Sequence, residues 1–162
     1  MSFISRTGII LSTTLLLTTV FIPLSGQTDG HENEHVDVQL VRKLINNYER
    51  LDWDAVADTF AEQGTLHSVM RAPFSGREII RDRLIKFHKG IESMQLDILH
   101  IVKVDEVVIV ERMDHFVING VNRRIPAVGV LSIEHGKVTL WKEYYDLESL
   151  LTRLNPDYPG DD

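Results

Sequence analysis

Apolar side chains recur at intervals of three and four residues in two stretches of the chain, a spacing typical of amphipathic helices. The first stretch covers residues 36–50, with apolar positions at Val36, Leu40, Val41, Leu44, Ile45 and Tyr48. The second covers Arg77–Ile91, with Ile80, Leu84, Phe87 and Ile91 along one stripe. Between them, Asp52 can cap a short helix that we expect to end at Gly64.

A short strand over Thr65–Val69 and a loop over Met70–Gly76 are expected before the second long helix. After Glu92 the apolar residues alternate with polar ones, which predicts strands near Met94–Val104, Val107–Val117, Arg123–Glu134 and Lys137–Tyr145. Asn119-Gly120 and His135-Gly136 are typical of hairpin turns. A closing helix is expected over Leu147–Leu154. Helices followed by strands predict an α+β domain, in which the helices cross a strongly curved sheet and leave a conical pocket.

The first 26 residues have the pattern of a secretory signal peptide. A single Arg precedes an uncharged stretch over residues 7–25, and the small residue Gly26 follows it. The alternative is a membrane anchor through residues 7–25, although Pro23 and the threonines weaken that interpretation. The prediction is therefore export to the periplasm or the extracellular space, with residues 27–35 as a polar linker, 36–154 as the working domain and 155–162 as a tail.

Composition narrows the possible chemistry. The chain has 162 residues, no cysteine and a formal net charge of −7, so disulfides, thiolate metal sites and cysteine nucleophiles are excluded. The acidic balance argues against nucleic acid as a partner, since phosphate binding needs clustered Lys and Arg. Histidine and carboxylate spacings indicate no metal site, and nothing in the sequence calls for a cofactor.

Charged residues inside two predicted strands are the main candidates for chemistry. Arg112 and Asp114 share a strand face with Val108, Val110 and Phe116. On the last strand, Glu143 lies between Trp141 and Tyr145 on one face. If both faces turn into the pocket, Arg112 can bridge the two carboxylates and one of their pKa values should rise, leaving an acid and a base in one site. A surface cross-strand ion pair remains the alternative.

The same residues carry a family resemblance. The segments Glu111-Arg112-Met113-Asp114, Val128–Val138 and Trp141–Leu147 resemble the limonene-1,2-epoxide hydrolase family, within the SnoaL-like and nuclear-transport-factor-2-like group. The likeness covers roughly residues 36–154. It implies a curved mixed sheet with helices over a deep apolar pocket, often in a homodimer through the sheet. It also implies one-step addition of water to an epoxide, with no metal, cofactor or covalent intermediate.

The resemblance also implies roles for individual residues. Asp114 matches the acid that protonates the epoxide oxygen, Arg112 matches the bridge, and Glu143 stands where the family has its basic aspartate. The family holds its water with a tyrosine and an asparagine, and an ungapped match puts Leu66 and Ser68 there. Ser68 can still hold a water. His67 lies between them, pointing away in that register and inward after a one-residue slip.

The remaining predictions concern the pocket and the other basic residues. A small apolar ligand is expected to contact Leu66, Leu84, Phe87, Phe116, Ile125, Ala127, Trp141 and Tyr145. We expect His100 to be structural, His88 and His115 to be surface or interface groups, and Arg81, Arg83, Lys86 and Lys89 to form an exposed helix face. Two further functions fit the same pocket: a non-catalytic ligand-binding module, and an isomerase or dehydratase that uses the same acid–base pair.

Overall fold

The computed structural model describes residues 34–155 and 157–161, and the predictions for the signal peptide or anchor lie outside them. Three helices come first along the chain: α1 (Val36–Glu49), α2 (Trp53–Asp58) and, after two strands, α3 (Arg77–Phe87). The strands are β1 (Phe60–Ser68), β2 (Phe74–Ser75), β3 (Ser93–Val104), β4 (Val107–Ile118), β5 (Val121–Glu134) and β6 (Lys137–Tyr144). A short helix, α4 (Leu147–Arg153), follows β6. In the described part of the chain, no helix is long and apolar enough to span a bilayer.

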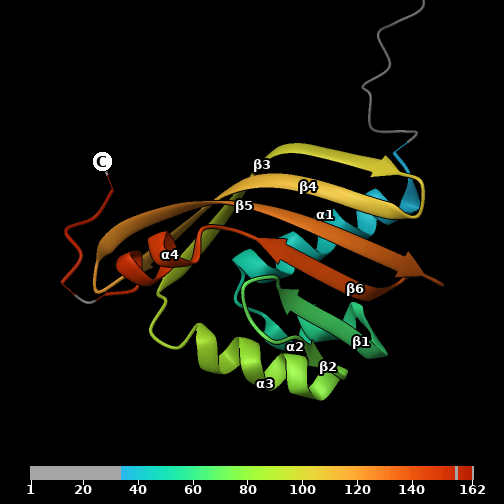
Figure 1. The fold of residues 1–162 in the computed structure, drawn as a ribbon, viewed down its shortest axis with the longest axis horizontal. Helices are drawn as coiled ribbons and strands as arrows, with labels where there is room; N and C mark the ends of the chain where they lie inside the picture. Colours follow the sequence, from blue (N-terminus) through green and yellow to red (C-terminus); the bar gives the residue numbers. More distant parts are fainter. Residues whose placement is uncertain (1–33, 156, 162) are drawn as a thin grey trace, which may run out of the picture. The chain divides into compact units, whose positions relative to one another are not determined.

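The six strands form one open, mixed sheet in the order β2-β1-β6-β5-β4-β3. Strands β3 to β6 are an antiparallel meander, and β1 joins the sheet by pairing in parallel with β6. Figure 1 shows β4 and β5 as long, bent strands, with α1, α2 and α3 on one side of the sheet. The predicted α+β class with helices packed on a curved mixed sheet is confirmed.

The helices stay on the sheet because their apolar stripes are buried. Val41 and Leu44 of α1 and Ile80 of α3 are fully buried and belong to one core with Val110 of β4 and Trp141 of β6. Side-chain caps set two helix starts. The Asp52 carboxylate accepts a hydrogen bond from the Ala55 N–H at the start of α2, and the Asp146 carboxylate accepts one from the Ser149 N–H at the start of α4. The core therefore lies between the concave sheet face and the three helices.

The predicted hairpins are confirmed by the backbone. Asn119 and Gly120 have φ of 53° and 71°, and His135 and Gly136 have 51° and 71°. Two successive positive φ values match the right-handed twist of the flanking strands. These turns set the register that puts Arg112 opposite Ala127 and Gly129 opposite Glu143.

Several predicted boundaries were wrong. Gly64 does not end a helix; it lies in β1, which begins at Phe60, and a Cβ there would come 2.9 Å from the Val138 carbonyl oxygen. The predicted loop over Met70–Gly76 contains the short strand β2. Helix α3 ends at Phe87 rather than Ile91, with the His88 N–H bonded to the Leu84 carbonyl. Sequence periodicity cannot show where tertiary pairing extends a strand or ends a helix.

The C-terminal residues 157–161 are held against the domain by one carboxylate. Asp161 accepts hydrogen bonds from the Arg153 side chain, the Tyr158 hydroxyl and the Arg124 backbone N–H. The fully buried Arg123 side chain also donates to the Asn155 carbonyl. Within the predicted tail, residues 157–161 therefore contact the domain through these hydrogen bonds.

Candidate active site

The three charged candidates lie on neighbouring strands of the concave face. Arg112 and Asp114 occupy alternate positions of β4, on the same side as the buried Val110 and Phe116. Glu143 comes from β6, and β5 lies between the two strands. The Arg112 side chain must therefore cross β5 to reach Glu143.

Small residues on β5 leave the space for this crossing. Ala127 pairs with Arg112, and Gly129 pairs with both Val110 and Glu143. A Cβ on Gly129 would come 3.2 Å from Arg112 Nη1 and 2.9 Å from Trp141 Nε1. Any larger side chain at this position would push either the guanidinium or the indole out of place.

Arg112 binds both carboxylates. Its Nε donates to Asp114 Oδ1 at 2.7 Å, and its Nη2 donates to Asp114 Oδ2 at 3.2 Å and to Glu143 Oε2 at 2.9 Å. Arg112 and Glu143 are buried, and Asp114 is nearly so. A buried guanidinium with two carboxylates is costly to desolvate, so such an arrangement is tolerated only when hydrogen bonds pair the charges, as they do at this site.

Burial changes the protonation of these groups. It raises the pKa of both Asp114 and Glu143 above their usual values, and the opposing effect of Arg112 does not cancel it. The negative charge of Asp114 also raises the pKa of Glu143. Because the two carboxyls share one cation, they titrate as a coupled pair, and one proton between them leaves one acid and one base.

These groups lie in an apolar pocket of about 130 Å³. All the apolar residues predicted for it are in its lining: Leu66, Leu84, Phe87, Phe116, Ile125, Ala127, Trp141 and Tyr145. Ser68 also lines the pocket, and its strand position pairs with Glu143 in the parallel β1–β6 register. His67 is not in the lining, as the unslipped register of β1 requires, so the structure does not bring His67 to the site to position a water.

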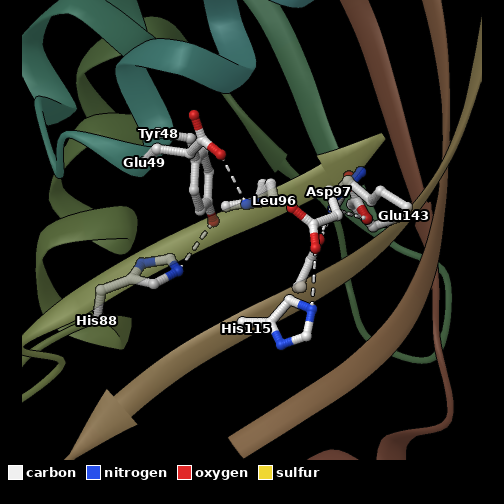
Figure 2. Close-up of polar contacts among 9 residues, drawn as sticks. Tyr48, Glu49, His88, Leu96, Asp97, His115 and Glu143 are labelled. Atoms are coloured by element: carbon white, nitrogen blue, oxygen red, sulfur yellow. Dashed lines mark hydrogen bonds and ion pairs between the residues drawn. The ribbon is translucent and has the colours of Figure 1, made fainter. Parts of the chain in front are cut away.

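The opposite wall carries a polar pair that sequence reasoning missed. His88, predicted as a surface or interface group, is buried and lines the pocket with Tyr48. Figure 2 shows Tyr48 of α1 directed at His88 at the end of α3, and the Tyr48 hydroxyl lies 2.9 Å from His88 Nε2. The sequence signal was Tyr48 on the buried stripe of the first helix, but its partner depends on how α1 packs against α3.

The protonation of this pair follows from burial. Desolvation lowers the pKa of His88 to about 4, so the ring is neutral at pH 7. Its Nδ1 lies 2.8 Å from the Leu84 carbonyl oxygen, which can only accept, so Nδ1 carries the proton. Nε2 then accepts from the Tyr48 hydroxyl, whose oxygen keeps its lone pairs free for another donor. Burial, and next the charge of Glu143, raise the pKa of Tyr48 well above its usual value.

The other basic candidates lie elsewhere. His100 is exposed and pairs with Glu111, and His115 lies 3.2 Å from Asp97 at the strand surface shown in Figure 2. Arg83, predicted on an exposed helix face, is half-buried and lines the pocket, as does Arg71. Within residues 34–155 and 157–161, no group of three histidine or carboxylate side chains is arranged to hold a metal ion.

Comparisons with known proteins now identify the family. The family model of the limonene-1,2-epoxide hydrolase catalytic domain matches residues 35–155. The chain belongs to this family. The match includes all three residues of the Arg112 cluster, and the members of the wider fold group include cyclases and isomerases as well as hydrolases. A search of curated proteins found no match.

Solved structures support the same fold for this limonene-1,2-epoxide hydrolase family member. An LEH-like epoxide hydrolase from M. tuberculosis is 21% identical with a TM-score of 0.64, covering 74% of this chain and 92% of that one. A protein described as a SnoaL-like polyketide cyclase from Shewanella putrefaciens CN-32 is 19% identical with a TM-score of 0.67, covering 75% and 98%. A protein with a ketosteroid isomerase-like fold from Catenulispora acidiphila, solved with trimethylamine, is 22% identical with a TM-score of 0.64, covering 71% and 91%.

The neutral, buried His88 predicts a specific loss of stability in acid. The unfolded histidine takes up its proton near pH 6.5 and the native one only near pH 4, so the native state loses stability as pH falls through this window. Between pH 7.5 and 5.0 we expect His88 to account for a loss of about 2 kcal/mol, from about 1.4 kcal/mol per pH unit. Urea unfolding of the native protein and of His88→Gln at pH 7.5 and 5.0 measures this change in the free energy of unfolding.

The exposed His100 supplies the matched control. His100→Gln should keep the full acid sensitivity of the native protein, whereas His88→Gln should lose about 2 kcal/mol of it. Equal acid sensitivity in the native protein and His88→Gln would contradict a neutral, buried His88.

Proposed function

We propose that the protein hydrolyses small apolar epoxides to diols in a single acid–base step. The observation that carries the proposal is the Arg112 guanidinium hydrogen-bonded to both Asp114 and Glu143 at the buried end of an apolar pocket. An apolar pocket that ends in an acid and a base can open a strained C–O bond by protonating its oxygen while water attacks the carbon.

The size of the pocket supports a small substrate. A volume of about 130 Å³ is close to that of the ~150 Å³ protein cavity known to admit benzene. Its walls are mainly side chains such as Phe116, Ile125 and Trp141, which exclude competing water and strengthen the electrostatic interactions inside. A substrate of roughly ring size is therefore the first class to test.

In the proposed step, ionised Glu143 removes a proton from a water molecule, and the water oxygen bonds to one epoxide carbon. The C–O bond at that carbon breaks, and its electron pair goes to the epoxide oxygen, which takes the proton of neutral Asp114. Glu143 is left protonated and Asp114 ionised, so one proton must return to Asp114 before the next turnover. Arg112 stabilises the carboxylate in both states because it donates to both groups.

The residues near Glu143 indicate where the attacking water can be held. Ser68 lies beside Glu143 across the parallel β1–β6 pair, where its hydroxyl can donate and accept. Leu66, two residues earlier on β1, lines the pocket but offers no hydrogen bond. The free lone pairs of the Tyr48 hydroxyl supply a polar atom from the helix side instead. We propose that Ser68 and Tyr48 hold the water that Glu143 activates.

Replacing the acid tests the proposal directly. Asp114→Asn keeps the shape but cannot release a proton, so diol formation from cyclohexene oxide should fall at least about 100-fold. Gas chromatography with mass detection measures the rate of diol formation. In ¹⁸O-labelled water the label must appear in the diol, since the attacking oxygen comes from water. Asp97→Asn, an exposed carboxylate on β3, is the control and should leave turnover unchanged. Native-like turnover by Asp114→Asn would contradict this role; a native protein that binds but never turns over an epoxide panel would favour a binding module.

Two substitutions at Glu143 separate its charge from its length. Glu143→Gln removes the base and should lower kcat at least about 100-fold. Glu143→Asp keeps the carboxylate but retracts it by about 1.5 Å, so its kcat should lie between those of Glu143→Gln and the native protein. The loss of activity at low pH that comes from protonation of the base should survive in Glu143→Asp and disappear in Glu143→Gln, whereas the loss at high pH from ionisation of Asp114 should remain in both. Equal activity of the Gln variant and the native protein would contradict a base at this position.

We also propose a homodimer formed through the outer face of the sheet. Val102, Ile109 and Val130 follow one another across β3, β4 and β5 on the face opposite Arg112, and Val102 is 49% exposed. Glu111 and Lys142 flank this row, so a two-fold axis can bring opposite charges of two copies together. An apolar face of this kind favours a second copy as its cover.

The dimer is tested by analytical ultracentrifugation. Val130→Lys should convert a native dimer into monomers with an unchanged circular dichroism spectrum, because a lysine at the centre of an apolar interface is left without a partner. Val36→Lys, at a valine that is 70% exposed on α1, is the control and should remain dimeric. A native protein that sediments as a monomer at micromolar concentration would contradict the proposal.

A further inference from the structure

The pocket contains two arginines that the proposed reaction does not use. Its lining holds Arg71, Arg83 and Arg112 as cations, against Asp114 and Glu143 as the carboxyl groups. Arg112 is bound to both carboxyls, so Arg71 and Arg83 add positive charge to a pocket in a chain whose net charge is −7. A pocket that is more positive than its protein favours a ligand with a negative charge.

Arg83 is held in place but has no acidic partner within residues 34–155 and 157–161. Its guanidinium lies over the Phe74 ring, 4.2 Å from the centroid, and its Nε is buried without a hydrogen-bond partner among the described residues. Arg42, Arg77, Arg81 and Arg153, in contrast, each pair with a carboxylate. Stacking on Phe74 limits the rotation of Arg83, so the entropy lost on binding an anion is smaller than for a free surface arginine.

Arg71 lies on the loop that follows β1. Its backbone N–H donates to the Ser68 carbonyl at 2.8 Å, which makes a turn of the loop directly after β1. Ser68 is the residue that pairs with Glu143, so the turn lies next to the pocket. Arg71 is exposed and Arg83 half-buried, whereas Arg112 and Glu143 are buried. This gradient of exposure places Arg71 and Arg83, which form no ion pair with the described carboxylates, at the mouth of the pocket and Asp114 and Glu143 at its inner end.

We propose that the pocket binds an apolar molecule that ends in a carboxylate, with the carboxylate at Arg71 and Arg83 and the apolar body against Leu84 and Phe116. At the inner end Arg112 is already bound to both carboxyls and offers an anion no free cation, whereas the planar guanidinium of Arg83 at the mouth matches a carboxylate with two parallel hydrogen bonds. This inference rests on the proposed function only in naming its substrate class: an epoxy acid whose ring oxygen reaches Asp114.

Two ligands of nearly equal shape test the inference by binding alone. Cyclohexanecarboxylate and cyclohexanecarboxamide differ in charge, and both can be titrated into the full-length protein by isothermal titration calorimetry at pH 7.5 and fixed ionic strength. We expect the carboxylate to bind at least tenfold more tightly than the amide. Arg83→Gln should remove most of that preference, because it weakens binding of the carboxylate, which forms charge-assisted hydrogen bonds, far more than binding of the neutral amide.

Three further measurements complete the design. Arg71→Gln should reduce the preference in the same direction but less, because Arg71 is exposed and its charge is screened. Arg83→Lys keeps the charge but loses the fork, and should give an intermediate preference. Arg124→Gln is the matched control, since Arg124 is exposed and outside this pocket, and should bind both ligands like the native protein.

Equal binding of the two ligands, no binding of either, or an undiminished preference in Arg83→Gln would each overturn the inference. So would inorganic phosphate that displaces the carboxylate at equal concentration, because the site would then recognise a free anion without the apolar body. Failure of the proposed function has a different result: no diol from any epoxide, with the carboxylate preference and its loss in Arg83→Gln intact.

Discussion

The site depends on one interaction: the buried guanidinium of Arg112 donating to Asp114 on its own strand and to Glu143 two strands away. An unpaired charge at this depth would cost several kcal/mol, so the buried guanidinium requires an ionised carboxylate beside it. The interaction also constrains β5, whose Ala127 and Gly129 must stay small because the guanidinium passes over them. The contact between Arg112 and Glu143 therefore depends on the sheet register, on the turns that set it, and on the small size of two β5 side chains.

The same burial that makes the cluster costly makes it useful. Water would hold both carboxylates ionised, whereas the apolar pocket raises both pKa values and lets the pair share a proton. The Tyr48–His88 pair does not oppose this effect, because His88 is neutral and adds no charge to the opposite wall. A protonated histidine there would favour two ionised carboxylates and remove the acid from the pair.

Sequence alone predicted the strand-borne part of the site because a strand has a strict period of two. Once Arg112 shares a face with buried valines, Asp114 must share it too, and the same rule separates Leu66 and Ser68 from His67. The helix-borne part depends on the packing angle between helices, which no local pattern contains. His88 and Arg83 were therefore misplaced on the surface, although the stripe of Leu84 beside them was predicted correctly. Gly64 was misread as a helix end for a related reason: its lack of a side chain is explained by the close approach of the Val138 carbonyl oxygen, a tertiary contact that the local sequence does not show.

Two departures from the family pattern, Leu66 and Glu143, lie on the strand side of the site. Leu66 removes a hydrogen-bonding group from β1, and the structure offers the Tyr48 hydroxyl from α1, with His88 fixing its proton. Glu143 extends one methylene further into the pocket than aspartate, toward the space between these walls. A longer base suits the proposed water position beside the Tyr48 hydroxyl, because a water held nearer the helices needs a base that reaches it. A protein that had lost hydrolysis through Leu66 alone would not need to keep its other buried polar groups. Neither the tyrosine–histidine pair nor the hydrogen-bonded Arg112 would have to remain in the apolar pocket, since buried polar groups are costly unless they are paired.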